Sequence, residues 1–179
     1  MIKDIVCVTD HIKDFDTVEK KFLDSYFCEE LSSKATILLV WHRKIDEKYL
    51  LNFPNVRAIV RYGVGYDNID INYCSKKNII VLNNPDYGVD EVSDTALGMI
   101  LNLTRNINGF QSFACEHNES WLGKEINYRA RRTNTLKLGI IGLGRIGGAL
   151  ARKFSAISKY VSFYDPYLNS GVEKIYGYK

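Results

Sequence analysis

The chain has 179 residues, of which 46% are apolar and 25% are charged, and this balance is typical of a globular protein with one large core or two small ones. Its 24 basic and 21 acidic residues leave a net charge of +3, which is too small to indicate a nucleic acid or a membrane surface as partner. The four cysteines form no C-x-x-C pair, which favours free thiols in a reducing, cytoplasmic compartment over a disulfide framework or a metal site.

Four short apolar runs in the first half of the chain predict buried strands, because parallel strands covered on both faces are apolar throughout. Segments with helical spacing separate these runs, and this alternation predicts a parallel sheet with helices on its faces. The first run carries Asp4, which is atypical of a signal peptide, and no apolar run is long enough to span a membrane. We expect strands over residues 2–9, 36–41, 56–61 and 79–82, and helices over residues 15–31, 44–51 and 71–77.

The longest periodic segment predicts a single helix over residues 89–107. Val92, Met99 and Leu103 fall on one stripe at helical spacing. Acidic residues occupy its first turns and Arg105 lies near its end, an order of charges that complements the helix dipole. A helix of about 20 residues is about 30 Å long and can bridge two domains. Residues 110–135 are expected to form a polar, irregular connection.

A second strand–helix–strand unit is predicted after residue 136, with strands over 138–141 and 160–164 and a helix over 145–157. Between its first strand and its helix, Gly142 permits a tight turn, Gly144 lets the backbone approach a pyrophosphate, and Gly147 lets helix and strand pack closely. The N–H groups and the dipole at the start of the helix favour phosphate. Asp165 ends the second strand at about the spacing expected for an acid that binds ribose. This pattern predicts a dinucleotide site; the alternative is a glycine turn without a ligand.

Residues 56–71, 79–105 and 138–154 resemble the D-isomer-specific 2-hydroxyacid dehydrogenases, in that family's order. The resemblance implies an α/β fold in which a flavodoxin-like parallel-sheet substrate domain, residues 1–108 with the long junction helix, precedes an incomplete, doubly wound Rossmann domain, residues 109–179. It also implies an NAD-dependent oxidoreductase that acts on the CH–OH group of a small 2-hydroxy acid or on the matching 2-keto acid.

On the substrate side, the loop from Arg61 to Gly65 matches the loop whose backbone N–H groups hold the substrate carboxylate in the family. Within it, the resemblance assigns the substrate to Tyr62, Gly63, Val64 and Gly65. Glycines expose N–H groups to an anion, which agrees with this role. The alternative is a tight turn in which residues 67–68 cap the next helix. Both interpretations can hold together.

On the cofactor side, the resemblance assigns Arg145 and Ile146 to positions that flank the pyrophosphate of NAD, beside the three glycines. It assigns Asp165 to the adenosine ribose and Thr95 to a hydroxyl near the nicotinamide. The alternative for Thr95 is an ordinary exposed threonine of a helix.

The arginine, glutamate and histidine that carry out hydride transfer in the family belong to the second half of its Rossmann domain, so we expect no catalytic residue in this chain. His11, His42 and His117 lie outside the segment that matches the catalytic histidine and are expected at the surface.

We therefore expect a truncated dehydrogenase that is inactive alone. Two alternatives remain open, a non-catalytic NAD-sensing regulatory module and one chain of a split enzyme. As partners we expect a second copy in a homodimer, or a chain that supplies the missing C-terminal half. The sequence does not select one hydroxy acid.

Overall fold

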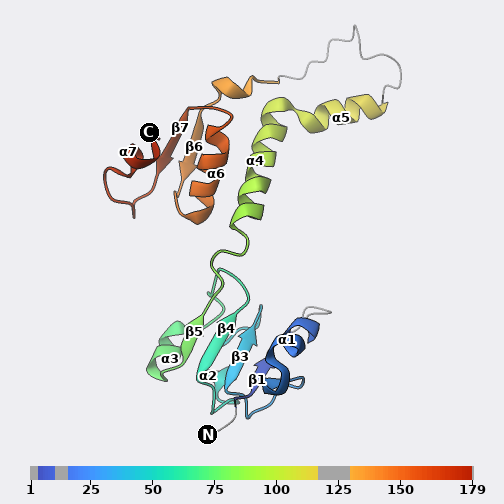
Figure 1. Cartoon of the computed structure of the whole chain (residues 1–179), viewed down its shortest axis with the longest axis vertical. Coiled ribbons are helices and arrows are strands. Elements are labelled where there is room, and N and C mark those ends of the chain that lie inside the picture. Colours follow the sequence, from blue (N-terminus) through green and yellow to red (C-terminus); the bar gives the residue numbers. More distant parts are fainter. Residues whose placement is uncertain (1–3, 11–15, 117–129, 179) are drawn as a thin grey trace. The chain divides into compact units, whose positions relative to one another are not determined.

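The computed structural model describes residues 4–10, 16–116 and 130–178. The chain divides into two compact units, Met1–Tyr87 and Gly88–Lys179 (Figure 1). Each unit has a hydrophobic core of its own. This division precedes the long helix, whereas the sequence-based boundary after residue 108 places that helix in the first domain. The sequence-based boundary stays a prediction.

The first unit is built on a five-stranded, wholly parallel sheet with the strand order β2-β1-β3-β4-β5. This order is that of flavodoxin-like sheets, so the predicted α/β class and flavodoxin-like topology are confirmed. The strands are β1 (Val6–Val8), β2 (Phe27–Cys28), β3 (Ile37–Val40), β4 (Ala58–Arg61) and β5 (Ile80–Leu82). The helices are α1 (Asp16–Leu23), the 3-10 turn η1 (Asp24–Tyr26), α2 (Glu47–Leu50) and α3 (Ile71–Lys76).

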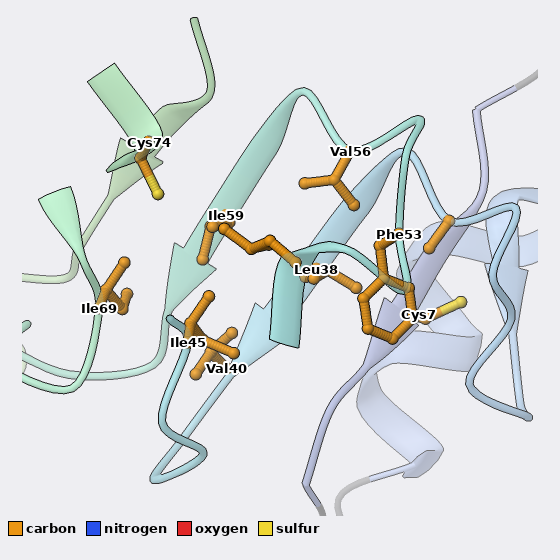
Figure 2. Close-up of a cluster of buried hydrophobic side chains, with 11 residues drawn as sticks. Cys7, Leu38, Val40, Ile45, Phe53, Val56, Ile59, Ile69 and Cys74 are labelled. Carbon is orange, nitrogen blue, oxygen red and sulfur yellow. The ribbon is translucent and has the colours of Figure 1, made fainter. Parts of the chain in front are cut away.

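The two faces of this sheet carry separate clusters of apolar side chains, because successive strand residues point to opposite faces. Leu38 and Ile59 are fully buried in the cluster that α2 and α3 cover (Figure 2). Leu39 belongs to the cluster on the other face, where Leu23 of α1 packs. Each such side chain contributes roughly 1.5–3 kcal/mol when it leaves water, so the sheet is stabilised from both faces, as the apolar runs predicted.

The prediction of a helix over residues 15–31 is wrong beyond residue 23. Helix α1 ends at Leu23, and Asp24 then adopts a left-handed conformation with φ 45°, which a helix does not accommodate. The edge strand β2 follows within the same segment. Its two residues are too few to show a strand period, which is why the pattern did not indicate it.

The second unit contains the parallel pair β6 (Leu138–Ile141) and β7 (Val161–Tyr164), and α6 (Arg145–Ser155) packs on one face of the pair. This strand–helix–strand arrangement agrees with its prediction. The remaining elements are α4 (Val89–Arg105), α5 (Ile107–Glu116), the 3-10 turn η2 (Thr133–Thr135) and α7 (Val172–Tyr176).

The long helix ends earlier than predicted, and a second helix follows it. Asn106 has a left-handed backbone with φ 53°, a conformation that Asn tolerates and that commonly ends helices. Helix α5 then spans Ile107–Glu116. The prediction of an irregular segment from residue 110 is therefore wrong up to residue 116. Residues 117–129 of that segment lie outside the described residues.

The apolar stripe of α4 does not face the core. Leu103 on this stripe is 80% exposed. The face that packs instead carries Ser93, which is fully buried, and Leu97 and Ile100, which lie against the cluster around α6. From α6, Lys153 reaches the Asp90 and Asp94 carboxylates at 3.0 and 2.7 Å and the Ser93 hydroxyl at 2.8 Å. Polar contacts therefore fix the N-terminal half of α4 on α6.

Among the described residues, no helix is long and apolar enough to cross a membrane, and no cluster of three or more His, Cys, Asp or Glu side chains could hold a metal ion. The four cysteines are free, with Cys7 and Cys74 buried.

Candidate functional site

The loop Tyr62–Gly65 follows β4 at the carboxyl edge of the first unit's sheet, the edge at which open α/β sheets bind ligands. Two of its carbonyls already accept hydrogen bonds. The Gly63 carbonyl accepts from the Asn84 N–H at 3.1 Å, and the Val64 carbonyl accepts from Asn83 Nδ2 at 2.8 Å. Within the described residues, no acceptor meets the N–H groups of Gly63, Val64 and Gly65. The loop therefore presents donors, which is the polarity that an anion requires.

The side chain of Tyr62 anchors α1 through Glu19. Its hydroxyl donates to Glu19 Oε1 at 2.5 Å, and Glu19 is only 7% exposed. Burial, then the hydrogen bond and charge of Glu19, raise the pKa of the Tyr62 hydroxyl far above its usual range. The Tyr62 side chain therefore stays neutral, and only the backbone of Tyr62 is available to a ligand.

Asp10, two residues after the end of β1, organises the neighbouring loop after β3. Its carboxylate accepts from the backbone N–H groups of Trp41, His42 and Arg43 at 3.1, 2.6 and 2.9 Å. Burial alone would raise the pKa of Asp10, but the hydrogen bonds from Thr9 and from these three N–H groups outweigh burial and lower it. The position between β1 and β3 is where flavodoxin-like sheets bind their ligand, and here a carboxylate of the chain itself occupies the N–H groups.

Further hydrogen bonds tie the loop after β3 to the loop after β4. Asn68 Nδ2 donates to the Arg43 carbonyl at 2.9 Å, and the Ile45 N–H donates to the Asn68 carbonyl at 2.8 Å. The prediction that residues 67–68 cap the next helix is wrong, because the Asp70 carboxylate caps α3 by accepting from the Tyr73 N–H at 2.9 Å. Asn68 instead connects the loop after β3 with the loop after β4.

At each of the three glycine positions after β6, a different physical reason favours glycine. Gly142 has φ +87°, which L side chains rarely adopt. A Cβ on Gly144 would meet nothing within 4 Å, so the space above it is open to a ligand. A Cβ on Gly147 would lie 2.0 Å from the Gly142 carbonyl oxygen, so glycine is needed for α6 to pack against the turn.

Helix α6 begins at this turn without a side-chain cap on Gly144. Arg145 and Ile146 form the exposed start of its first turn. The first N–H groups of a helix have no partner within the helix, so the turn and the helix start form a ready anion site.

Asp165, after β7, closes the same turn. Its two oxygens accept from the Leu143 and Tyr167 N–H groups, each at 2.9 Å. A carboxylate offers about four acceptor positions, so Asp165 keeps the capacity to accept further hydrogen bonds. The residues predicted for the cofactor are thus brought together around one turn, with one exception. Thr95 lies on α4, where its hydroxyl donates to the Glu91 carbonyl at 2.8 Å, as in an ordinary exposed helix threonine.

Asp10 was not among the predicted site residues, and Arg61 was predicted as the first residue of the loop without a role for its side chain. Asp10 acts through contacts about 30 positions away in sequence, for which a single sequence carries no signal. Arg61 closes β4, and its guanidinium lies over Gly63. A basic residue that ends an apolar strand just before a glycine loop was the available signal. His42 is exposed, as expected, with its ring 4.0 Å from that of Trp41; His11 and His117 lie outside the described residues.

Comparison with known proteins gives a consistent family match. The family model for the D-isomer specific 2-hydroxyacid dehydrogenase, catalytic domain, matches residues 4–169. A curated relative, the D-3-phosphoglycerate dehydrogenase of Mycobacterium bovis, is 29% identical over 158 residues, which cover 86% of this chain and 29% of that protein. The chain thus spans less than a third of that curated relative.

Solved structures agree in fold. The D-lactate dehydrogenase from Aquifex aeolicus, complexed with NAD and lactic acid, matches with a TM-score of 0.80 at 26% identity, covering 98% of this chain and 55% of that one. An NADPH-dependent glyoxylate/hydroxypyruvate reductase from Sinorhizobium meliloti, in complex with citrate, matches with a TM-score of 0.77 at 23% identity, covering 96% and 56%. The second likeness concerns the fold alone, and the chain spans about half of each solved relative.

Proposed function

The chain belongs to the D-isomer specific 2-hydroxyacid dehydrogenase family, and we propose that it binds NAD at the glycine turn of its second unit and a small 2-hydroxy or 2-keto acid at the Tyr62–Gly65 loop of its first. The observation that carries the proposal is the turn after β6. There, an uncapped helix start, open space above Gly144 and an acid after the next strand occur together.

Each cofactor contact follows from the chemistry of its group. The pyrophosphate would bind the first turn of α6 over Gly144, flanked by Arg145 and Ile146, and Asp165 would accept the hydroxyls of the adenosine ribose. NAD supplies the hydride acceptor of the oxidation when it is bound. Thr95 remains a proposed contact on the nicotinamide side, with a hydroxyl oxygen that can still accept a hydrogen bond.

We expect NAD in preference to NADP, because Asp165 accepts from a 2′-hydroxyl but repels a 2′-phosphate. Calorimetric titration of the full chain with NAD and with NADP measures this preference. Asp165→Asn should reduce it, because the variant removes the charge and keeps an acceptor for the turn. Asp24→Asn, an equal loss of charge at an exposed turn of the first unit, is the control. Equal or tighter binding of NADP by the parent chain would contradict the proposal.

We also propose that the chain assayed alone does not turn over a 2-hydroxy acid. A proton must leave the substrate hydroxyl with the hydride, and a positioned general base typically contributes ~10²–10⁴-fold. Of the described residues, His42 is the sole histidine, and it does not belong to the Tyr62–Gly65 loop or the glycine turn. NADH oxidation with a panel of 2-keto acids tests this, and turnover of about 1 s⁻¹ or more, within the range of ordinary enzymes, would contradict it.

A two-chain dehydrogenase is a second candidate, and the exposed outer face of β6 and β7 favours it. Ile141 on this face is 91% exposed and Tyr164 is exposed beside it. Sheets in this class of fold are covered on both faces, so another chain could supply the cover. Light scattering of the purified chain, followed by the NADH assay in the presence of a captured partner, distinguishes this candidate from an inactive binding module.

A further inference from the structure

Cys7 and Cys28 occupy directly opposite positions on neighbouring strands of the first unit. In the parallel pair of β1 and β2, Cys7 pairs with Cys28 and Val6 pairs with Phe27. Paired residues of a parallel ladder point to the same face of the sheet, and the apolar clusters agree with this register. Cys28 packs against the cluster that contains Cys7, whereas Phe27 packs against the cluster that contains Val6. The two thiols therefore lie on one face of the sheet.

The spacing of the two cysteines suits a disulfide bond. Neighbouring strands lie about 4.8 Å apart, and the Cα atoms of a disulfide are usually about 4.4–6.8 Å apart. Burial raises the pKa of the Cys7 thiol, and the Cys28 thiol adds to this effect through its charge and a hydrogen bond, as expected of sulfur atoms that are close together. Strand β2 has two residues and ends the sheet, with β1 as its neighbour. An edge strand this short can make the small shift that an S–S bond requires.

The two thiols differ in their access to solvent. Cys7 is fully buried, whereas Cys28 is only partly buried. Oxidation of a cysteine depends on its exposure as well as on its thiolate fraction, so an oxidant in solution reaches Cys28 first. Cys74 is buried at the opposite end of the same cluster from Cys7 (Figure 2), and Cys115 belongs to α5 of the second unit. Cys7 is therefore the thiol placed to react with an oxidised Cys28.

We propose that Cys7 and Cys28 form a reversible redox-modification site, at which hydrogen peroxide converts the two thiols into a disulfide that joins β1 to β2. The Cys28 thiolate attacks the O–O bond of the peroxide. This step gives a sulfenic acid on Cys28 and a hydroxide, which takes up the proton that the Cys28 thiol lost. The Cys7 sulfur then attacks the Cys28 sulfur, and the sulfenic hydroxyl leaves as water with the Cys7 proton. Two thiols are oxidised and one peroxide is reduced to two water molecules.

The bond would close a loop of the chain that carries α1. Glu19 of this helix accepts the hydrogen bond from Tyr62, so the closed segment is already attached to the end of β4. A disulfide that closes a loop of about 20 residues restricts the unfolded chain more than the folded one. Oxidation should therefore stabilise the first unit, and a thiol reductant should reverse this gain.

The test is treatment of the folded full chain with hydrogen peroxide, followed by alkylation, digestion without reductant and mass spectrometry. Cys115→Ser serves as the parent because it lacks the exposed thiol of α5. It should lose two free thiols per chain and yield a peptide in which Cys7 is linked to Cys28, and dithiothreitol should restore both thiols. Adding Cys74→Ser, which removes the other buried thiol, is the matched control and should leave the yield of the linked peptide unchanged. Adding Cys28→Ser should abolish the linked peptide.

The same treatment in urea tests whether the folded sheet selects the pair. The unfolded chain should yield a mixture of pairings, so the same mixture from the folded chain would overturn the proposal. Oxidation of Cys28 to a sulfinic acid without a link to Cys7 would overturn it too. The urea midpoint should rise after oxidation of the parent and stay unchanged in Cys28→Ser. A midpoint that falls in the linked chain would show that the bond does not fit the native pairing of β1 and β2, which also contradicts the proposal.

Discussion

The Tyr62–Gly65 loop and the glycine turn after β6 use the same backbone device with opposite side chains. Each follows a parallel strand and presents N–H groups where a ligand can approach. Beside the loop lies Arg61, which pairs with no carboxylate of the described residues, whereas beside the turn lies an acid, Asp165, already bonded to the Leu143 N–H. Backbone N–H groups favour any anion, so the neighbouring side chain has to supply the selectivity. In the proposed function, the acid beside the turn would select ribose hydroxyls against an extra phosphate, whereas the cation beside the loop would favour an anion.

The two regions also differ in what holds them in place. The turn depends on close contact between backbone atoms, as at Gly147 and the Gly142 carbonyl. The loop edge depends on carboxylates, Asp10 and Glu19, which accept from the backbone and from Tyr62. Substitutions and acid should therefore affect the two regions differently.

The largest effect is expected at Gly147. In Gly147→Ala the added methyl group would lie 2.0 Å from a backbone oxygen, so α6 or the turn must shift, at a cost of about 3 kcal/mol or more in the free energy of unfolding. The measurement is urea unfolding of the full chain, followed by near-ultraviolet signals of the second unit. Gly144→Ala is the control, because its methyl group meets nothing. It should change stability by less than about 0.5 kcal/mol yet weaken NAD binding. Equal destabilisation by both variants would contradict the distinct roles of the two glycines.

A smaller effect is expected at Tyr62. Tyr62→Phe removes the donor to a carboxylate that is 7% exposed, and a buried acceptor without a partner costs about 1–3 kcal/mol. The same unfolding measurement checks it, and Tyr66→Phe, at an exposed tyrosine just after the loop, should cost almost nothing. If both tyrosines behave alike, the anchoring of α1 through Glu19 is wrong.

Local patterns were enough to predict the parts of the fold that repeat along the chain. The apolar runs at β3, β4, β6 and β7 are long enough to indicate strands with buried side chains. The spacing of the three glycines indicates one compact turn. The sequence could not predict the edge strand β2, whose two residues carry no period. It also could not show that Lys153 holds the polar face of α4 while the apolar stripe is exposed. Such choices are decided by contacts between residues far apart in sequence.

The smallest effect is expected at Asp10, and it should depend on pH. Because the folded chain lowers the pKa of Asp10, the ionised carboxylate is stabilised by folding. That contribution is fully present above the unfolded pKa of about 3.9, and it is lost as the pH falls through the lower folded value. Asp10→Asn keeps an acceptor but lacks the charge, so it should be less stable than the parent by about 1 kcal/mol at neutral pH. The difference should shrink as the pH falls below about 4.

Urea unfolding of both chains at pH 7 and pH 3 measures this difference in stability, with Asp67→Asn, on an exposed turn, as the control for general charge effects. A stability difference that is the same at both pH values would show that the three N–H groups after β3 are held by shape alone. In that case the contrast between a loop edge held by carboxylates and a turn held by backbone contact would fail at Asp10.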